Sequence, residues 1–120
     1  DLAACAALCR RVHGHDRDRE LTAGVALATA TVVERHSRIT GYASDIGYYG
    51  HAVAETDDDL KALIAAAPTF SGPGFIVPTR NGALLRWCLD RGLRVVQPLT
   101  LMSLGLYQAP NGAFLPSILF

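Results

Sequence analysis

The chain has no excess of charge, no long apolar run and little cysteine. Its 11 basic and 11 acidic residues balance, which argues against a nucleic-acid or anionic-membrane partner, because such partners select a positive surface. No apolar run approaches the roughly 18 residues that a membrane span needs, so we expect a soluble protein. The three cysteines are odd in number and nothing resembles a secretory signal, which together indicate reduced thiols in a cytoplasm.

Length sets the domain count. The chain has 120 residues, which is enough for one hydrophobic core and too few for two. No internal repeat, linker or low-complexity segment divides it, so residues 1–120 are treated as a single domain. Because the chain begins with Asp1 and not with Met, we expect it to be a piece of a longer protein.

Two helices are predicted at the start of the chain. Residues 1–12 are rich in alanine, with an acidic front, a basic end and one apolar stripe, as helices favour. Residues 13–16 break this helix. A second helix then runs to about Ala26, with Asp16 or Asp18 as its cap.

The later helices are predicted from their boundaries. Thr56 and three aspartates precede a helix over residues 60–67, where acidic groups suit the positive end of the helix dipole. A further helix lies between Asn81, which can cap the first turn, and Gly92, which can take the left-handed conformation that ends a helix. Its predicted apolar face, packed on a sheet, consists of Leu84, Leu85, Cys88 and Leu89.

The predicted strands are segments rich in β-branched, aromatic and other apolar residues. The first two form an antiparallel hairpin across a short turn, and the last one could pair with the strand before it. These strands are residues 28–35, 39–46, 51–55, 74–79, 94–101 and 113–120.

The helix between Asn81 and Gly92 carries a family resemblance. In the GNAT superfamily of acyl-CoA-dependent N-acetyltransferases, a strand ends in an Asn that opens a helix, and the helix closes eleven residues later in Gly and a large apolar residue, as Asn81, Gly92 and Leu93 do here. The chain resembles most closely the C-terminal, second domain of bacterial tandem GNAT proteins. The segments that carry this resemblance, in order, are residues 33–35, 38–43, 50–55, 60–64, 78–82, 86–89 and 115–119.

The resemblance implies an α/β (α+β) GNAT fold, with a mixed, mostly antiparallel central sheet flanked by about four helices and its first strand missing from this chain. It implies transfer of an acetyl group from acetyl-CoA to an amine of a small molecule or peptide. The implied partner is the N-terminal GNAT domain of the same protein or a second copy. The cofactor would contact Val53, Ala54 and Asn81, with backbone groups near Val53 polarising the thioester carbonyl.

One departure from the family concerns the phosphates of the cofactor. GNAT proteins bind the CoA diphosphate at a loop of the form Arg/Gln-x-x-Gly-x-Gly/Ala, where glycines let backbone N–H groups approach the anion. The corresponding residues 55–59 are Glu-Thr-Asp-Asp-Asp, with neither glycine nor cation. We therefore expect this half to be degenerate in CoA binding. In the alternative reading it is a non-catalytic domain that packs on a catalytic N-terminal GNAT domain and shapes its substrate cleft.

Two residues are candidates for catalysis. Glu55 could deprotonate the amine, although a glutamate before Thr-Asp-Asp-Asp also fits a helix-capping cluster, the interpretation we favour. Cys88 stands where many family members carry a tyrosine that protonates the leaving thiolate. A cysteine, with a pKa of about 8.5, could donate that proton, but a cysteine on an apolar helix face is more often a core residue.

A substrate pocket could be lined by Tyr48, Tyr49 and His51. The tyrosines equally fit a domain interface, and a strand histidine under a helix is commonly a packed one. The first helix also places Cys5, Cys9 and His13 four residues apart. Core packing explains this spacing better than zinc, which normally gathers four ligands from turns, so no metal site is predicted.

Overall fold

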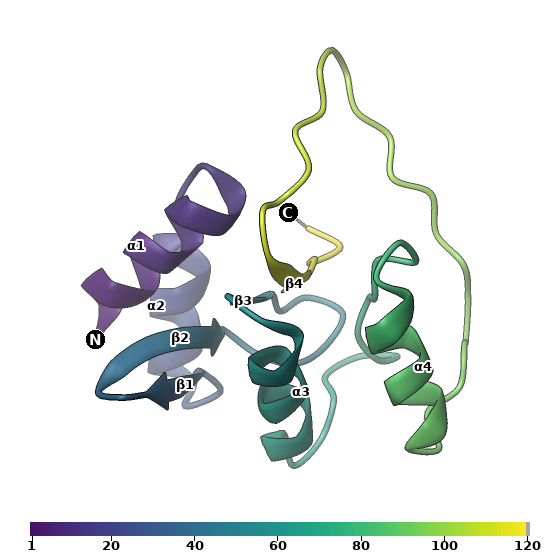
Figure 1. The fold of residues 1–120 in the computed structure, drawn as a ribbon, viewed down its shortest axis with the longest axis horizontal. Helices are drawn as coiled ribbons and strands as arrows, with labels where there is room; N and C mark the ends of the chain where they lie inside the picture. The colour runs from purple at the N-terminus through teal and green to yellow at the C-terminus, as the bar shows by residue number, and fades with distance from the viewer. Residues whose placement is uncertain (120) are drawn as a thin grey trace.

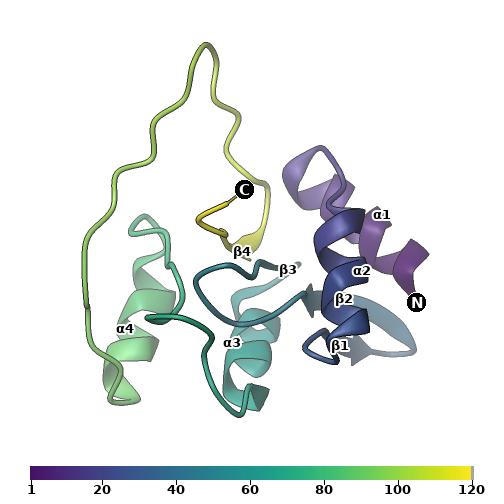
Figure 2. The ribbon, with the colours of Figure 1, turned by 180° about the vertical axis from the view of Figure 1, so that it is seen from behind.

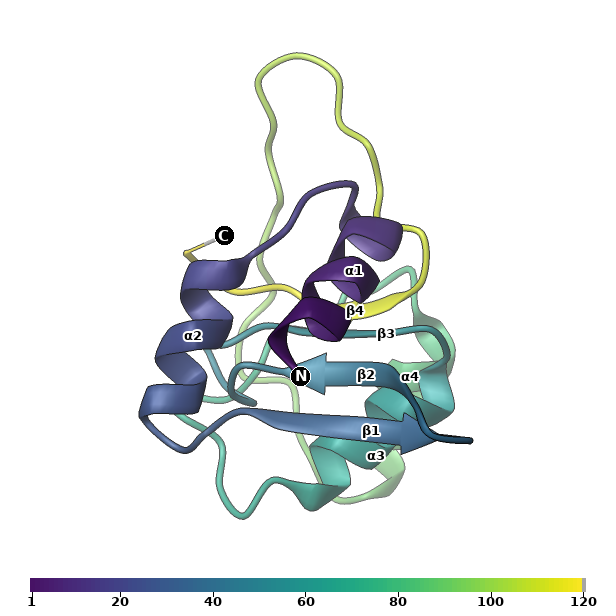
Figure 3. The ribbon, with the colours of Figure 1, turned by 90° about the vertical axis from the view of Figure 1, so that its left-hand side faces the viewer.

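The computed structural model describes residues 1–119, which form a mixed α/β (α+β) fold of four helices and one four-stranded antiparallel sheet. The strand order is β1-β2-β3-β4, so strands that are consecutive in the chain are also neighbours in the sheet. The elements are α1 (Leu2–His13), α2 (Asp18–Ala26), β1 (Thr31–Arg35), β2 (Arg38–Ala43), β3 (Ala52–Ala54), α3 (Asp57–Ala66), α4 (Gly82–Asp90) and β4 (Ala113–Leu115). Helices α1 and α2 lie on one side of the sheet and α3 and α4 on the other (Figures 1 and 3).

The alternation of side chains along the strands divides the core into two clusters. Tyr42, Val53 and Phe114 are register neighbours across β2, β3 and β4, and they pack with the buried face of α1. Ala43 and Ala52 are one position further along, and they pack with the apolar residues of α3 and α4. One face of this short sheet therefore packs against α1, and the other face packs against α3 and α4.

Thr56, Asn81 and Gly92 mark helix ends as predicted, although α3 runs over Asp57–Ala66 and so begins three residues before the predicted start at residue 60. Thr56 accepts a hydrogen bond at 3.2 Å from the N–H of Asp59 at the start of α3. Asn81 accepts one at 3.2 Å from the N–H of Leu84 at the start of α4, and Gly92, with φ 86°, follows its end. Because each cap satisfies a free group of the terminal turn, these boundaries are set locally.

The cap of α2 differs from the prediction. Arg17 occupies the cap position, and its side chain makes no capping hydrogen bond. Asp16 instead lies 3.4 Å from the guanidinium of Arg10, and Asp18 is already inside the first helical turn. The expectation that one of these two aspartates caps α2 was wrong, although the helix itself and its end at Ala26 are confirmed.

The predicted hairpin is present as β1 and β2. His36 and Ser37 form its two-residue turn with φ values of 51° and 60°, the positive angles that a tight hairpin turn needs to match the twist of the strands. The register shifts between Val33 and Glu34, which marks a bulge. Both strands are shorter than expected.

The second half of the chain departs from the predicted sheet. Residues 74–79 and 94–101 form no strand, so both expectations were wrong, and each segment contains a proline that lacks a ladder donor. Phe75 and Val77 pack against the core as irregular chain. The last strand is present as β4, but only over Ala113–Leu115 of the predicted residues 113–120, of which residue 120 lies outside the described residues. It pairs with β3 and not with residues 94–101.

None of the helices in residues 1–119 is long and apolar enough to cross a membrane.

Candidate functional site

The N-termini of α3 and α4 meet at the corner where the resemblance places the cofactor phosphates. The side-chain amide of Asn81 donates a hydrogen bond at 2.8 Å to the carboxylate of Asp57, while its oxygen caps α4. Thr56 caps α3. The side chains of Thr56 and Asn81 therefore already accept hydrogen bonds at the two helix starts, where free N–H groups could otherwise bind an anion.

Asp59, the last residue of the acidic run at this corner, is paired with an arginine. Burial alone would raise the pKa of Asp59, but the hydrogen bond and charge of the Arg35 guanidinium hold that pKa below its usual value. The Nε of Arg35 lies 2.9 Å from the Asp59 carboxylate. Asp58 is exposed, with Lys61 at 3.8 Å. Arg35 and Lys61, the cations beside this corner, are thus already paired with Asp59 and Asp58.

Val53 and Ala54, the predicted cofactor-binding residues of β3, are fully buried. Their strand has β2 on one side and β4 on the other, and Val53 lies opposite Tyr42 in β2 and Phe114 in β4. In an antiparallel sheet, each residue of such a central strand directs its N–H into one of the two ladders. The Val53 amide belongs to the ladder with β2 and the Ala54 amide to the ladder with β4, so neither is free to polarise a thioester carbonyl.

Glu55 follows β3 and lies on the α1 side of the sheet. Its carboxylate accepts hydrogen bonds from Arg38 at 2.9 Å and from Arg11 of α1 at 3.0 Å. The Arg38 guanidinium, with Arg11 beside it, holds the pKa of Glu55 below its ordinary value. A carboxylate so stabilised in its ionised form is a weak general base. The capping role that we favoured for it belongs to Thr56.

Cys88 lies on the other side of the sheet. It is buried on α4 beside Leu84, in the cluster that includes the apolar face of α3. Burial raises the pKa of the Cys88 thiol, which makes it a poorer acid toward a leaving thiolate. Because Glu55 and Cys88 lie on opposite faces, the structure does not bring the two predicted catalytic residues together.

The predicted pocket residues Tyr48 and Tyr49 lie in the loop between β2 and β3. Their rings make an edge contact with centroids 5.3 Å apart, and Tyr49 is exposed. The carbonyl of Tyr48 accepts a hydrogen bond from the N–H of Ile118, and that of Tyr49 accepts one from the hydroxyl of Ser117, both at 3.0 Å. The loop is therefore fixed against the C-terminal tail.

His51 is the centre of a buried polar network. The hydroxyl of Tyr42 lies 2.9 Å from its Nε2, and the hydroxyl of Ser44 lies 3.1 Å from its Nδ1. Burial, with only 1% of the residue exposed, lowers the pKa of His51 to about 3, so the ring is neutral at pH 7. Serine beside histidine is a nucleophile and base pair in some enzymes, but both side chains here are buried in the core and are not accessible to a ligand.

The sequence interpretation missed the roles of Tyr42 and Ser44. Part of a signal was available, because Tyr42 and Ser44 are two residues apart in the strand predicted over residues 39–46 and so share a face, but their pairing with the segment of His51 depends on the register of the folded sheet. The three side chains together satisfy polar groups in the core, which is the usual arrangement for buried polar atoms.

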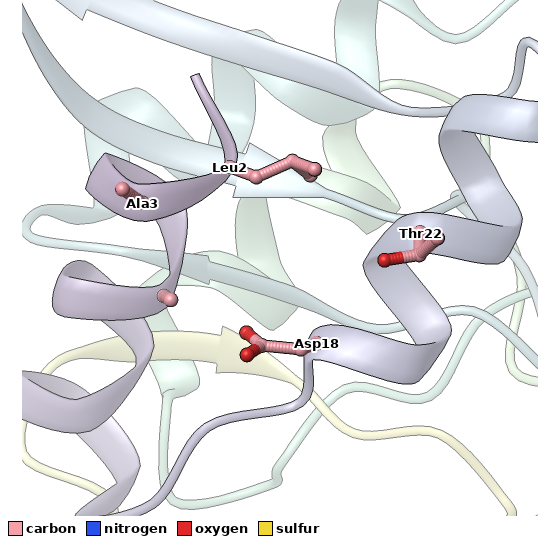
Figure 4. A pocket seen from close by; sticks show the side chains of 5 residues that line it. Leu2, Ala3, Asp18 and Thr22 are labelled. Atoms are coloured by element: carbon pink, nitrogen blue, oxygen red, sulfur yellow. The ribbon is translucent and has the colours of Figure 1, made fainter.

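A cleft between α1 and α2 is shown in Figure 4. Its volume is about 170 Å³, and the carboxylate of Asp18 and the side chains of Leu2 and Thr22 face it. Ligand pockets usually measure about 300–1,000 Å³, so this cleft is too small for a cofactor of the size of acetyl-CoA. The sequence interpretation treated Asp18 only as a helix cap.

The cysteine and histidine stripe of α1 is used in packing. Cys5 and Cys9 are buried in the cluster with Tyr42, and the ring of His13 stacks on that of His15 with centroids 5.6 Å apart. Over residues 1–119, no three His, Cys, Asp or Glu side chains are grouped so that they could hold a metal ion.

Comparison with family models, curated proteins and solved structures gave no match to this chain. The resemblance to GNAT proteins therefore stays a prediction.

Proposed function

We propose that this chain is a GNAT-like domain of a longer acetyltransferase, and that it does not itself hold acetyl-CoA. Its role is to pack on a cofactor-bearing GNAT domain and to shape the cleft in which the acceptor amine is acetylated. The observation that carries the proposal is the Asp57–Asn81 hydrogen bond, which joins the starts of α3 and α4 across the corner where a diphosphate would lie.

Electrostatics support this assignment. Two like charges about 4 Å apart repel by roughly 1 kcal/mol in water and about 4 kcal/mol near a protein surface. A diphosphate at this corner would meet Asp57, Asp58 and Asp59, and the nearby Arg35 already pairs with the last of them. The N–H groups of Asp59 and Leu84, which could otherwise bind the anion, already donate to Thr56 and Asn81.

The competing function is acetyl transfer by this chain alone. It would require β4 to leave β3 so that the Ala54 amide becomes available, since the Val53 amide faces β2. It would also require an acid and a base on one side of the sheet. Glu55 and Cys88 lie on opposite sides. The same geometry suits a domain that shapes the substrate cleft of its partner domain and does not itself catalyse acetyl transfer.

Calorimetric titration of acetyl-CoA into the chain tests the proposal. We expect no saturable heat up to about 1 mM ligand, which corresponds to binding weaker than roughly 4 kcal/mol. Saturable binding in the micromolar range would overturn it, because a site of that strength must hold the diphosphate.

A matched pair of variants tests the electrostatic reason. The double variant Asp57→Asn and Asp58→Asn removes two charges and keeps an amide oxygen for Asn81, whereas Asp90→Asn removes one exposed charge at the far end of α4. We expect titration with inorganic pyrophosphate to be tighter for the double variant than for Asp90→Asn. Equal affinities would show that charge is not what excludes the anion.

A further inference from the structure

Residues 94–109 form an extended arm that leaves the end of α4 and returns to β4 (Figures 1 and 2). No helix or strand is present in it. Its apolar side chains point away from the core, and Leu104 and Leu106 are fully exposed. The apolar residues of the arm that are about half to fully exposed are Val95, Val96, Leu99, Leu101, Met102, Leu104, Leu106 and Tyr107.

Contacts after the arm hold it away from the sheet. The N–H of Asn111 donates a hydrogen bond at 2.6 Å to the carbonyl of Val12 in α1. Gly112 is so close to β3 that a Cβ there would lie 3.0 Å from the carbonyl oxygen of Ala54. The turn at residues 110–112 is therefore used to attach the chain to α1 and β3. It does not fold the arm back on β4 as a hairpin.

Beyond its first residue, Arg94, the arm offers no charge for recognition of a charged partner. After Arg94, the sequence contains no Asp, Glu, Lys, Arg or His up to its last residue. The whole chain also has a formal net charge of zero. An identical copy therefore meets no charge repulsion at the arm, and its own arm supplies the matching apolar surface. Contact of one patch with the same patch across a two-fold axis is the commonest arrangement of dimers.

The exposed apolar area is of the size that a dimer buries. Full burial of a large apolar side chain corresponds to roughly 60–120 Å², so these eight side chains, whose exposed fractions together equal about six full side chains, present on the order of 350–700 Å². A standard interface buries about 800 Å² on each partner. The largest apolar patch of a typical monomer covers about 300–600 Å², and homodimer interfaces are the more apolar class.

We propose that the arms of two copies of this chain lie against each other and form a symmetric dimer. Within the arm, residues 99–104 carry no proline, glycine or charge, so they can pair their backbone groups with the same segment of the second copy, in antiparallel orientation. Pro98 and Gly105 limit that pairing on either side. The inference uses only the arm and stands whether or not the chain belongs to an acetyltransferase.

Sedimentation equilibrium between about 1 and 100 μM chain tests the proposal. We expect the apparent mass to rise to that of a dimer. The double variant Leu104→Glu and Leu106→Glu places two like charges in each arm at positions that contact nothing else, so its far-UV circular dichroism should be unchanged. Its dimer dissociation constant should rise by at least about tenfold, because like charges would face each other across the interface.

The control variant is Leu27→Glu, which adds a charge at an exposed leucine after α2 and outside the arm. It should dimerise like the parent chain. A parent chain that stays monomeric throughout would overturn the proposal, and so would a dimer that the arm variant leaves intact. Slow hydrogen exchange of arm amides in a monomeric sample would also overturn it, because another part of the same polypeptide would then cover the arm.

Discussion

Acid should destabilise this protein through His51, whose ring lies in the core between Tyr42 and Ser44. Burial is the main reason that its folded-state pKa falls to about 3 from an ordinary value of 6.5. The positive field of Arg17 lowers this pKa further, while Glu20 acts in the opposite sense. Protonation would also take away the ring lone pair that accepts a hydrogen bond.

The sign and size of the effect follow from proton linkage. Between pH 6.5 and pH 3 the unfolded chain binds a proton at this histidine and the folded chain does not, so stability falls as the pH is lowered through this range. From pH 7 to pH 5, the two pKa values predict a loss of about 2 kcal/mol from His51 alone. His13, with a folded pKa of about 4, acts in the same direction over the same range.

The variant His51→Gln separates the contribution of His51 to the pH dependence of stability from that of His13. Urea unfolding at pH 7 and pH 5 should show a smaller pH-dependent loss of unfolding free energy in His51→Gln than in the parent chain, by about 2 kcal/mol. The variant loses stability at pH 7 as well, because the buried partners of the ring are rearranged. The test therefore uses the change in unfolding free energy between pH 7 and pH 5, and not the absolute stability at either pH.

Nuclear magnetic resonance of the parent chain gives a second reading that needs no variant. The ring protons of His51 should not titrate between pH 7.5 and about pH 4 while the protein stays folded. A titration midpoint near 6.5 for this ring, or an unchanged pH dependence in a folded His51→Gln, would refute the reasoning.

Two further predictions concern packing. Leu84→Ala on the buried face of α4 should lower the unfolding free energy, measured by urea denaturation, by about 2–5 kcal/mol. Leu89→Ala, at a position 45% exposed, should lower it by less than about 1 kcal/mol. Equal losses would mean that α4 turns a different face to the core. Gly24→Ala should cost about 1–3 kcal/mol, because the new Cβ would lie 2.4 Å from the carbonyl oxygen of Ser44, and a thermal melting temperature equal to that of the parent chain would contradict this close approach.

The elements that could be predicted from sequence are those whose boundaries are satisfied by neighbours in the chain. The cap residues Thr56 and Asn81 accept hydrogen bonds from N–H groups three residues later, so the starts of α3 and α4 depend on local sequence alone. The turn at His36 and Ser37 joins two adjacent strands for the same reason. Arg17 at the start of α2 is the exception, because Asp16 pairs with Arg10 of the preceding helix.

The elements that could not be predicted depend on distant partners. Residues 74–79 and 94–101 have the composition of strands, but a strand needs a neighbour with free backbone groups, and β4 occupies the edge of β3. Composition does not specify which segment takes that edge. The candidate site shows the same limit, since the contact of Asp57 with Asn81 joins helices 24 residues apart in sequence.

The position of β4 links the fold to the proposed function. Opening β3 to a cofactor would break the pairs that Ala52, Val53 and Ala54 make with β4, and it would withdraw Phe114 and Leu115 from the two core clusters. Removing two such side chains from the core costs about 3–6 kcal/mol before any hydrogen bond is counted. Acetyl-CoA would have to recover that free energy at a corner whose carboxylates oppose its diphosphate. A domain arranged in this way is more stable closed, which favours a role in packing and substrate shaping over one in catalysis.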